Sequence, residues 1–75
     1  YTDVMRYFTG LIRFLIDRGT LLAHDPEIMA AQFCLPVSVW INLCDREPAR
    51  EAEVTALIAR HIRQFFKLYG TNGAD

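Results

Sequence analysis

The chain contains few of the residues that build cross-links or specialised sites. It has two cysteines, three prolines and four glycines in 75 residues, and the glycines are scattered, which excludes a glycine-rich phosphate loop. Cys34 and Cys44 fall within one expected helix, about 15 Å apart along its axis, which is beyond the reach of a disulfide within one chain. We therefore expect free thiols and a reducing, cytoplasmic location. A disulfide between two copies of the chain is the alternative.

Metal-binding and catalytic patterns are also missing from the sequence. There is no CxxC, HExxH or ExxH pattern, and no spacing links His24 with His61. His61 falls on an apolar helix face, where a histidine hydrogen-bonded to a neighbour is the expected arrangement. Two cysteines in an apolar stretch are usually unreactive core thiols. We expect no metal, no cofactor and no enzyme activity. A helical fragment of an enzyme, with its catalytic residues elsewhere, is the alternative.

The sequence has no excess of charge of one sign. Its 8 Lys and Arg residues face 9 Asp and Glu residues, for a net charge of -1, whereas a stand-alone nucleic-acid binder normally carries a basic face. Arg60, Arg63 and Lys67 form one short basic stripe, which we interpret as a solvated helix face, with a phosphate contact as the alternative. No apolar run approaches the roughly 20 residues that cross a bilayer, so we expect no membrane segment.

Hydrophobic side chains are abundant. They make up 52% of the residues against 23% charged, which excludes a disordered chain. A chain of this size buries only about 60% of its extended surface. Part of the apolar surface is therefore expected to contact a partner.

Periodicity and capping residues predict an all-α antiparallel bundle of three helices, over residues 3–18, 26–45 and 49–69. Asp25-Pro26-Glu27 is a strong helix start, because Asp caps, Pro fits the first helical position and Glu favours the positive end of the helix dipole. Gly19 and Gly70 fit the positions that follow helix ends. A disordered tail is expected at residues 71–75.

The second predicted helix is apolar on nearly every side, and its only polar stripe is Ser38, Asn42 and Asp45. A helix with so little polar surface is usually buried on two sides, and two neighbouring helices of this chain cannot easily cover both. Apolar positions in the third helix step by 4, 3, 4 and 3, as in a coiled-coil seam. These positions are Val54, Ile58, His61, Phe65 and Leu68.

Several motifs occur in an order that resembles one known family. The chain has Arg18-Gly19-Thr20-Leu21-Leu22, then Asp25-Pro26-Glu27-Ile28-Met29-Ala30-Ala31-Gln32-Phe33, and it closes its last helix with Phe65-Phe66-Lys67-Leu68-Tyr69-Gly70. This order resembles the C-terminal domains of TetR-type transcriptional regulators, which have a G-x-L stretch, then D-P-E-x-x-A-x-x-F, and a final F-x-x-x-Y-G. The resemblance covers about residues 8–70.

The resemblance implies a regulatory and dimerisation domain over residues 1–70. The start at Tyr1 indicates a fragment that lacks the N-terminal helix-turn-helix domain, through which alone operator DNA would be bound. A small apolar or amphipathic effector would change the dimer geometry and the affinity for the operator. A helical dimerisation module that binds no ligand is the alternative.

The resemblance also implies where the sites would lie. The last two helices would form a four-helix bundle with those of a twin subunit, in a homodimer. The expected dimer residues are Leu35, Val39, Trp40, Leu43, Val54, Ile58, His61, Ile62 and Phe65. The expected lining of the effector pocket is Met5, Phe8, Ile12, Met29 and Phe33.

Overall fold

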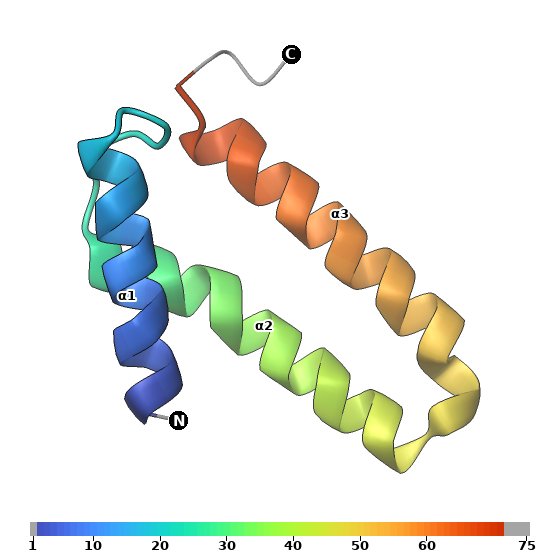
Figure 1. The fold of residues 1–75 in the computed structure, drawn as a ribbon. Coiled ribbons are helices and arrows are strands. Elements are labelled where there is room, and N and C mark those ends of the chain that lie inside the picture. The colour runs from blue at the N-terminus through green and yellow to red at the C-terminus, as the bar shows by residue number, and fades with distance from the viewer. Residues whose placement is uncertain (1, 72–75) are drawn as a thin grey trace.

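The computed structural model describes residues 2–71, and these residues form three α-helices and no strand. The helices are α1 (Thr2–Asp17), α2 (Pro26–Arg46) and α3 (Glu51–Tyr69), with a 3-10 turn at Pro48–Arg50 before α3 (Figure 1). The predicted all-α class is therefore confirmed, and the helix positions agree with the predicted ranges within two residues. Of the predicted disordered tail, residues 72–75 lie outside the described part.

The start of α2 is capped as its sequence predicts. One carboxylate oxygen of Asp25 accepts hydrogen bonds from the backbone N–H groups of Glu27, at 3.0 Å, and Ile28, at 3.4 Å. Pro26 occupies the first turn, where its missing N–H costs no hydrogen bond. These contacts satisfy backbone donors that have no partner inside the helix, and they fix the direction in which α2 leaves the loop.

The start of α3 differs from the prediction, which began this helix at residue 49. Pro48 opens a 3-10 turn instead, and Arg50 at the helix boundary makes no side-chain capping bond. Arg50 donates from Nε and Nη2 to Glu53 at 3.2 Å and lies 3.5 Å from Glu47. The hydrogen bond and charge of Glu53, with a smaller effect of Glu47, raise the pKa of Arg50. These ion pairs close the turn between α2 and α3.

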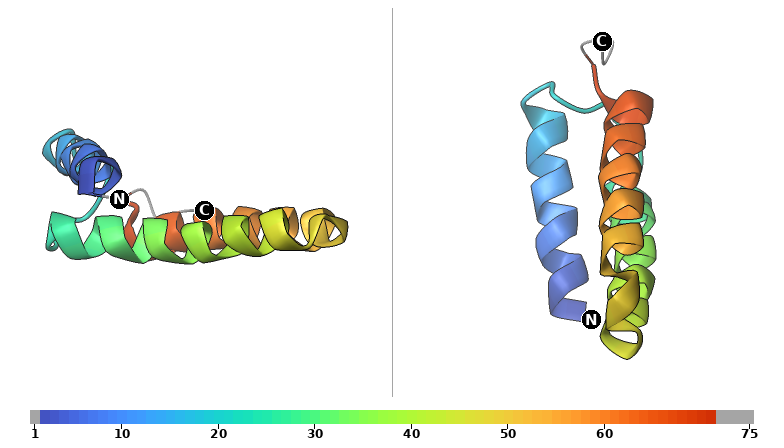
Figure 2. Two further views of the ribbon diagram at one scale, coloured as in Figure 1. Left: turned by 90° about the horizontal axis from the view of Figure 1, so that it is seen from below. Right: turned by 90° about the vertical axis from the view of Figure 1, so that its right-hand side faces the viewer.

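The core lies where α1 crosses the first half of α2, and the end of α3 contributes side chains to it. Its buried residues are Ile12, Leu21, Met29, Ala30 and Phe65. Half-buried residues of all three helices pack around this cluster. Figure 2 shows that α2 and α3 form one layer and that α1 lies on one side of it. The second half of α2 extends beyond the reach of α1.

Two segments far apart in the sequence join at one end of the molecule. The backbone N–H of Leu22 donates to the Tyr69 carbonyl at 2.7 Å, and that of Thr71 donates to the Thr20 carbonyl at 3.2 Å. The Thr71 hydroxyl donates to the Gly19 carbonyl at 2.5 Å. Gly19 has φ +82°, a conformation that glycine adopts without strain. We call these contacts between residues 19–22 and 69–71 the terminal latch.

The molecule is flat. Its extents are 39 × 32 × 14 Å, so its thickness is less than half of either of the other two dimensions. Its radius of gyration is 13.5 Å, whereas a compact domain of this length has about 11 Å. Because α1 covers only one side of the α2–α3 layer, the opposite broad face has no covering element among the described residues.

Candidate functional site

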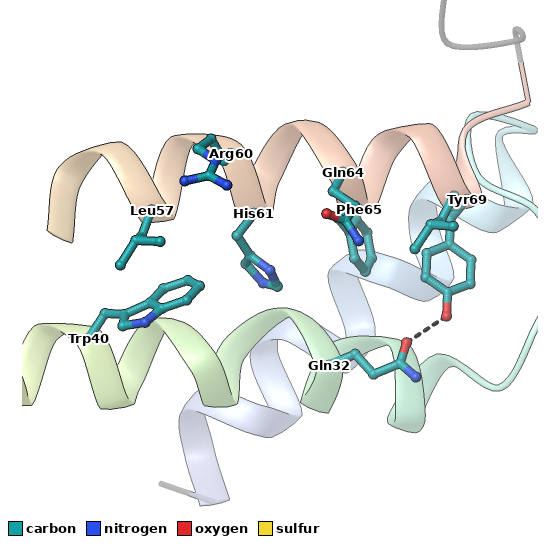
Figure 3. A pocket seen from close by; sticks show the side chains of 9 residues that line it. Gln32, Trp40, Leu57, Arg60, His61, Gln64, Phe65 and Tyr69 are labelled. Atoms are coloured by element: carbon teal, nitrogen blue, oxygen red, sulfur yellow. Dashed lines mark hydrogen bonds between the residues drawn. The ribbon is translucent and has the colours of Figure 1, made fainter. Parts of the chain in front are cut away.

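A groove lies between α2 and α3. It has a volume of about 340 Å³. Its lining residues are Gln32, Trp40, Leu57, Arg60, His61, Gln64, Phe65, Leu68 and Tyr69. In Figure 3 the ribbon of α1 lies behind these two helices. Phe65 lies on the side of α3 that joins the core with α1, and Leu57, Arg60 and Gln64 occupy helical positions on the other side of His61, so this wall of the groove faces away from α1. We call this groove the α2–α3 groove.

His61 ties the two walls of the groove together. Its Nε2 lies 3.0 Å from the backbone carbonyl of Phe33, and because a carbonyl only accepts, this nitrogen carries the hydrogen. Its ring also packs against the rings of Phe33 and Trp40, with centroids 5.6 and 5.5 Å away. Pro36, in the next turn of α2, has no N–H to continue the helical ladder at this point. The floor of the groove is therefore aromatic and fixed in position.

Polar groups lie along the rim of the groove. The Tyr69 hydroxyl donates to the side-chain oxygen of Gln32 at 2.5 Å, which closes one end (Figure 3). Arg60 is exposed and forms no salt bridge with any described residue. No carboxylate lines the groove. Arg60 is thus the one formal charge among the lining residues, and its exposed guanidinium is free to bind an acidic group of a partner.

An apolar strip on α2 runs along the same open side. Ile28, Leu35 and Val39 are 54%, 42% and 63% exposed, and their spacings of seven and four residues place them on one helix face. A second hollow continues this face, lined by Val39, Asn42, Asp45 and Arg46. We call Ile28, Leu35 and Val39 the outer strip of α2. Three large apolar side chains in a row on a broad bare face are typical of a protein contact.

The residues expected at the dimer contact are divided among three environments. Val54 and Phe65 are buried within the chain, whereas Leu35, Val39 and Ile62 are exposed. The half-buried ones are Trp40, Leu43, Ile58 and His61. His61 and Phe65 belong to the row of α3 residues that faces α2. Leu57 and Gln64 lie on one side of this row, and Ile62 lies on the other side. The nine residues therefore do not share one surface.

The five residues expected to line the effector pocket pack around the core. Ile12 and Met29 are buried in it, and Met5, Phe8 and Phe33 pack against it. The rings of Phe8 and Phe33 lie 6.0 Å apart between centroids. None of the five lines the α2–α3 groove or the hollow beside Val39. The structure thus brings the five residues together, as contacts between α1 and α2.

Several groove residues were not singled out as site residues from the sequence. Leu57 and Gln64 lie on α3 next to the predicted seam, seven residues apart, and Leu68 of the seam lines the groove beside them. The same 3.6-residue periodicity that predicted the seam could have identified this neighbouring line. Ile28 was overlooked on α2, although it is seven residues before Leu35 and so shares its face.

The histidine, cysteine and acidic side chains of the described residues are dispersed. Within residues 2–71, no three His, Cys, Asp or Glu side chains gather in a way that could hold a metal ion. Cys34 is buried and Cys44 is half-buried, and both are free thiols. Burial raises the pKa of the Cys34 thiol, which keeps it in the unreactive protonated form.

By length and composition, α2 could also cross a membrane, since its mean hydropathy is 1.4. No long uninterrupted apolar run marks this helix in the sequence, because isolated polar residues such as Gln32 and Ser38 divide it. A helix packed between protein neighbours on two sides has the same composition.

Comparison of the chain with protein-family models, with curated proteins and with solved structures gives no match. The assignment of a function therefore rests on the sequence motifs and on the geometry of the α2–α3 layer.

Proposed function

We propose that this chain is a homodimerisation domain, in which α2 and α3 pack against the same helices of a second copy as a four-helix bundle. The observation that supports this proposal is the outer strip of α2 on the broad face that α1 leaves bare. Full burial of one such side chain stabilises by about 1.5–3 kcal/mol. A second copy offers the same strip in return, as a two-fold dimer requires.

The motif order adds a more specific proposal. We propose that the domain is the C-terminal part of a TetR-type regulator, which acts in the cytoplasm and binds operator DNA through an N-terminal domain outside this chain. A small apolar or amphipathic effector would change the spacing of the two DNA-binding domains. Sequencing the coding DNA upstream of Tyr1 tests this. A basic segment with a helix-turn-helix would support the proposal, whereas an initiator Met or an unrelated domain directly before Tyr1 would contradict it.

The dimer itself is tested by two matched substitutions on α2. Val39 is 63% exposed on the outer strip, and Ile41 is 49% exposed but lies about 200° further round the helix. We expect the intact protein and Ile41→Glu to be dimers by light scattering after size exclusion, and Val39→Glu to be a monomer, because it buries an unpaired charge at the contact. A dimeric Val39→Glu variant, or an equally dissociated Ile41→Glu variant, would contradict this location.

A ligand-free dimerisation module is the second candidate. It is favoured by one observation, namely that the five residues expected to line an effector pocket pack against one another around the core. Apolar dyes and lipophilic drugs distinguish the two candidates in a thermal-shift screen of the intact protein. A rise in melting temperature that Phe8→Ala abolishes would support an effector pocket at these residues. No shift with any compound would support the ligand-free module.

A further inference from the structure

One side of α3 carries a charge pattern that is complementary to itself. Glu53, Leu57, Arg60 and Gln64 follow each other at spacings of four, three and four residues, so they lie along one stripe of the helix. Leu57, Arg60 and Gln64 line the α2–α3 groove, and the stripe therefore belongs to the face away from α1. Its acidic and basic members are two helical turns apart, about 10.5 Å along the axis.

We propose that the two copies of α3 cross antiparallel on this face, with Arg60 of each copy bound to Glu53 of the partner subunit. This proposal rests on the proposed homodimer and adds its orientation and its specificity-determining pair. A two-fold axis perpendicular to α3 near Leu57 exchanges positions 53 and 60, so both ion pairs form at once. Leu57 meets the Leu57 of the partner subunit at the centre, and the partner's α3 covers the groove.

The charges argue against the parallel arrangement. A two-fold axis along α3 would place each residue opposite its own copy, so Arg60 would face Arg60 and Glu53 would face Glu53. Like charges facing each other across an interface are unfavourable, and they are a common means of rejecting wrong arrangements. The antiparallel crossing turns both repulsive contacts into attractive ones without changing any residue.

Within one chain, Arg60 and Glu53 are both able to form the proposed ion pair with a partner subunit. Arg60 has no salt-bridge partner among the described residues. Glu53 is held by Arg50 at 3.2 Å while its side chain is 55% exposed, so its carboxylate keeps room for a second cation.

Charge reversal tests the orientation directly. Arg60→Glu alone places two pairs of like charges across the interface, and so does Glu53→Lys alone. We expect the dimer dissociation constant of each variant to rise at least about tenfold. In a mixture of the two, every reversed charge finds an opposite one, so we expect a heterodimer close to wild-type affinity. Sedimentation equilibrium of each variant and of the mixture measures this, and Arg13→Glu on α1 is the matched control.

The outcomes separate the two proposals. A monomeric wild-type protein would overturn the homodimer and the orientation together. A wild-type dimer with both single variants still fully dimeric would leave the homodimer standing and overturn the ion pair. Dissociation of the single variants without a heterodimer in the mixture would also overturn it, since misfolding or local strain would then explain the loss. Circular dichroism of each variant shows whether its helices remain, and Arg50→Gln shows the effect of losing the Glu53 contact within one chain.

Discussion

At the scale of single residues, the burial of Cys34 makes the stability of the fold depend on pH. Burial raises the pKa of this thiol from its ordinary value of 9.0, so above pH 9 the unfolded chain loses a proton that the folded chain keeps. The folded state is therefore destabilised as the pH rises through that window, and this group has no effect well below it.

We expect the melting temperature to fall more steeply above pH 9 in the wild type than in Cys34→Ser, whose hydroxyl does not ionise. Thermal unfolding across pH 7–10.5 measures this. Alkylation of the folded protein should also reach half-buried Cys44 before Cys34. Equal alkylation rates of the two thiols would show that Cys34 is accessible.

The contacts of His61 predict how much its replacement lowers the free energy of unfolding. Replacing it by Ala removes the hydrogen bond to the Phe33 carbonyl and the ring contacts with Phe33 and Trp40. We expect a loss of about 2 kcal/mol in the free energy of unfolding, measured by urea denaturation. Arg63→Ala, on the exposed side of α3, should stay within about 0.5 kcal/mol of the wild type. Equal effects of the two changes would mean that His61 does not join the helices.

At the scale of the helices, the contribution of the α2 cap to the free energy of unfolding can be measured. Asp25→Ala removes the acceptor for two backbone N–H groups, so we expect a loss of about 1 kcal/mol in stability. Asp25→Asn keeps an acceptor oxygen and should restore most of it. Urea unfolding of both variants measures the difference, and an Asn variant as unstable as the Ala variant would assign the effect to the charge of Asp25 at the helix end.

The helices were largely predictable because their determinants are local. Asp25 and Pro26 begin α2 with their own atoms, and Gly70 follows α3 where it was expected. The start of α3 was not predictable in the same way, because a 3-10 turn and an α-helical turn differ little in sequence. The ion pairs of Arg50 with Glu47 and Glu53 depend on that turn.

At the scale of the whole molecule, the proposed homodimer would make the stability of the chain depend on protein concentration. If two copies bury the face away from α1, folding and association are coupled. We expect the melting temperature of the wild type to rise with protein concentration, and that of Val39→Glu to be lower and independent of it. Calorimetry over a hundredfold range of concentration measures this, and a constant wild-type melting temperature would contradict the coupling.

The sites were less predictable than the helices, because periodicity identifies an apolar face without naming its neighbour. Val54 and Phe65 satisfy the seam spacing, but their contacts lie within the chain. Leu35 and Val39 have the same apolar character and remain exposed. Phe65 belongs to the core that also contains Ile12 of α1 and Met29 of α2, so its burial depends on how the three helices meet in space, which periodicity does not reveal.

The terminal latch joins segments that are far apart in the sequence. The bond from the Thr71 hydroxyl to the Gly19 carbonyl joins positions 52 residues apart, whereas α1 meets α2 through the short loop between them. Closing a long loop costs more entropy than closing a short one. Closing the latch therefore carries a larger loop-closure cost than joining α1 to α2, and we expect its amide hydrogens to exchange with solvent faster than those of the core around Met29.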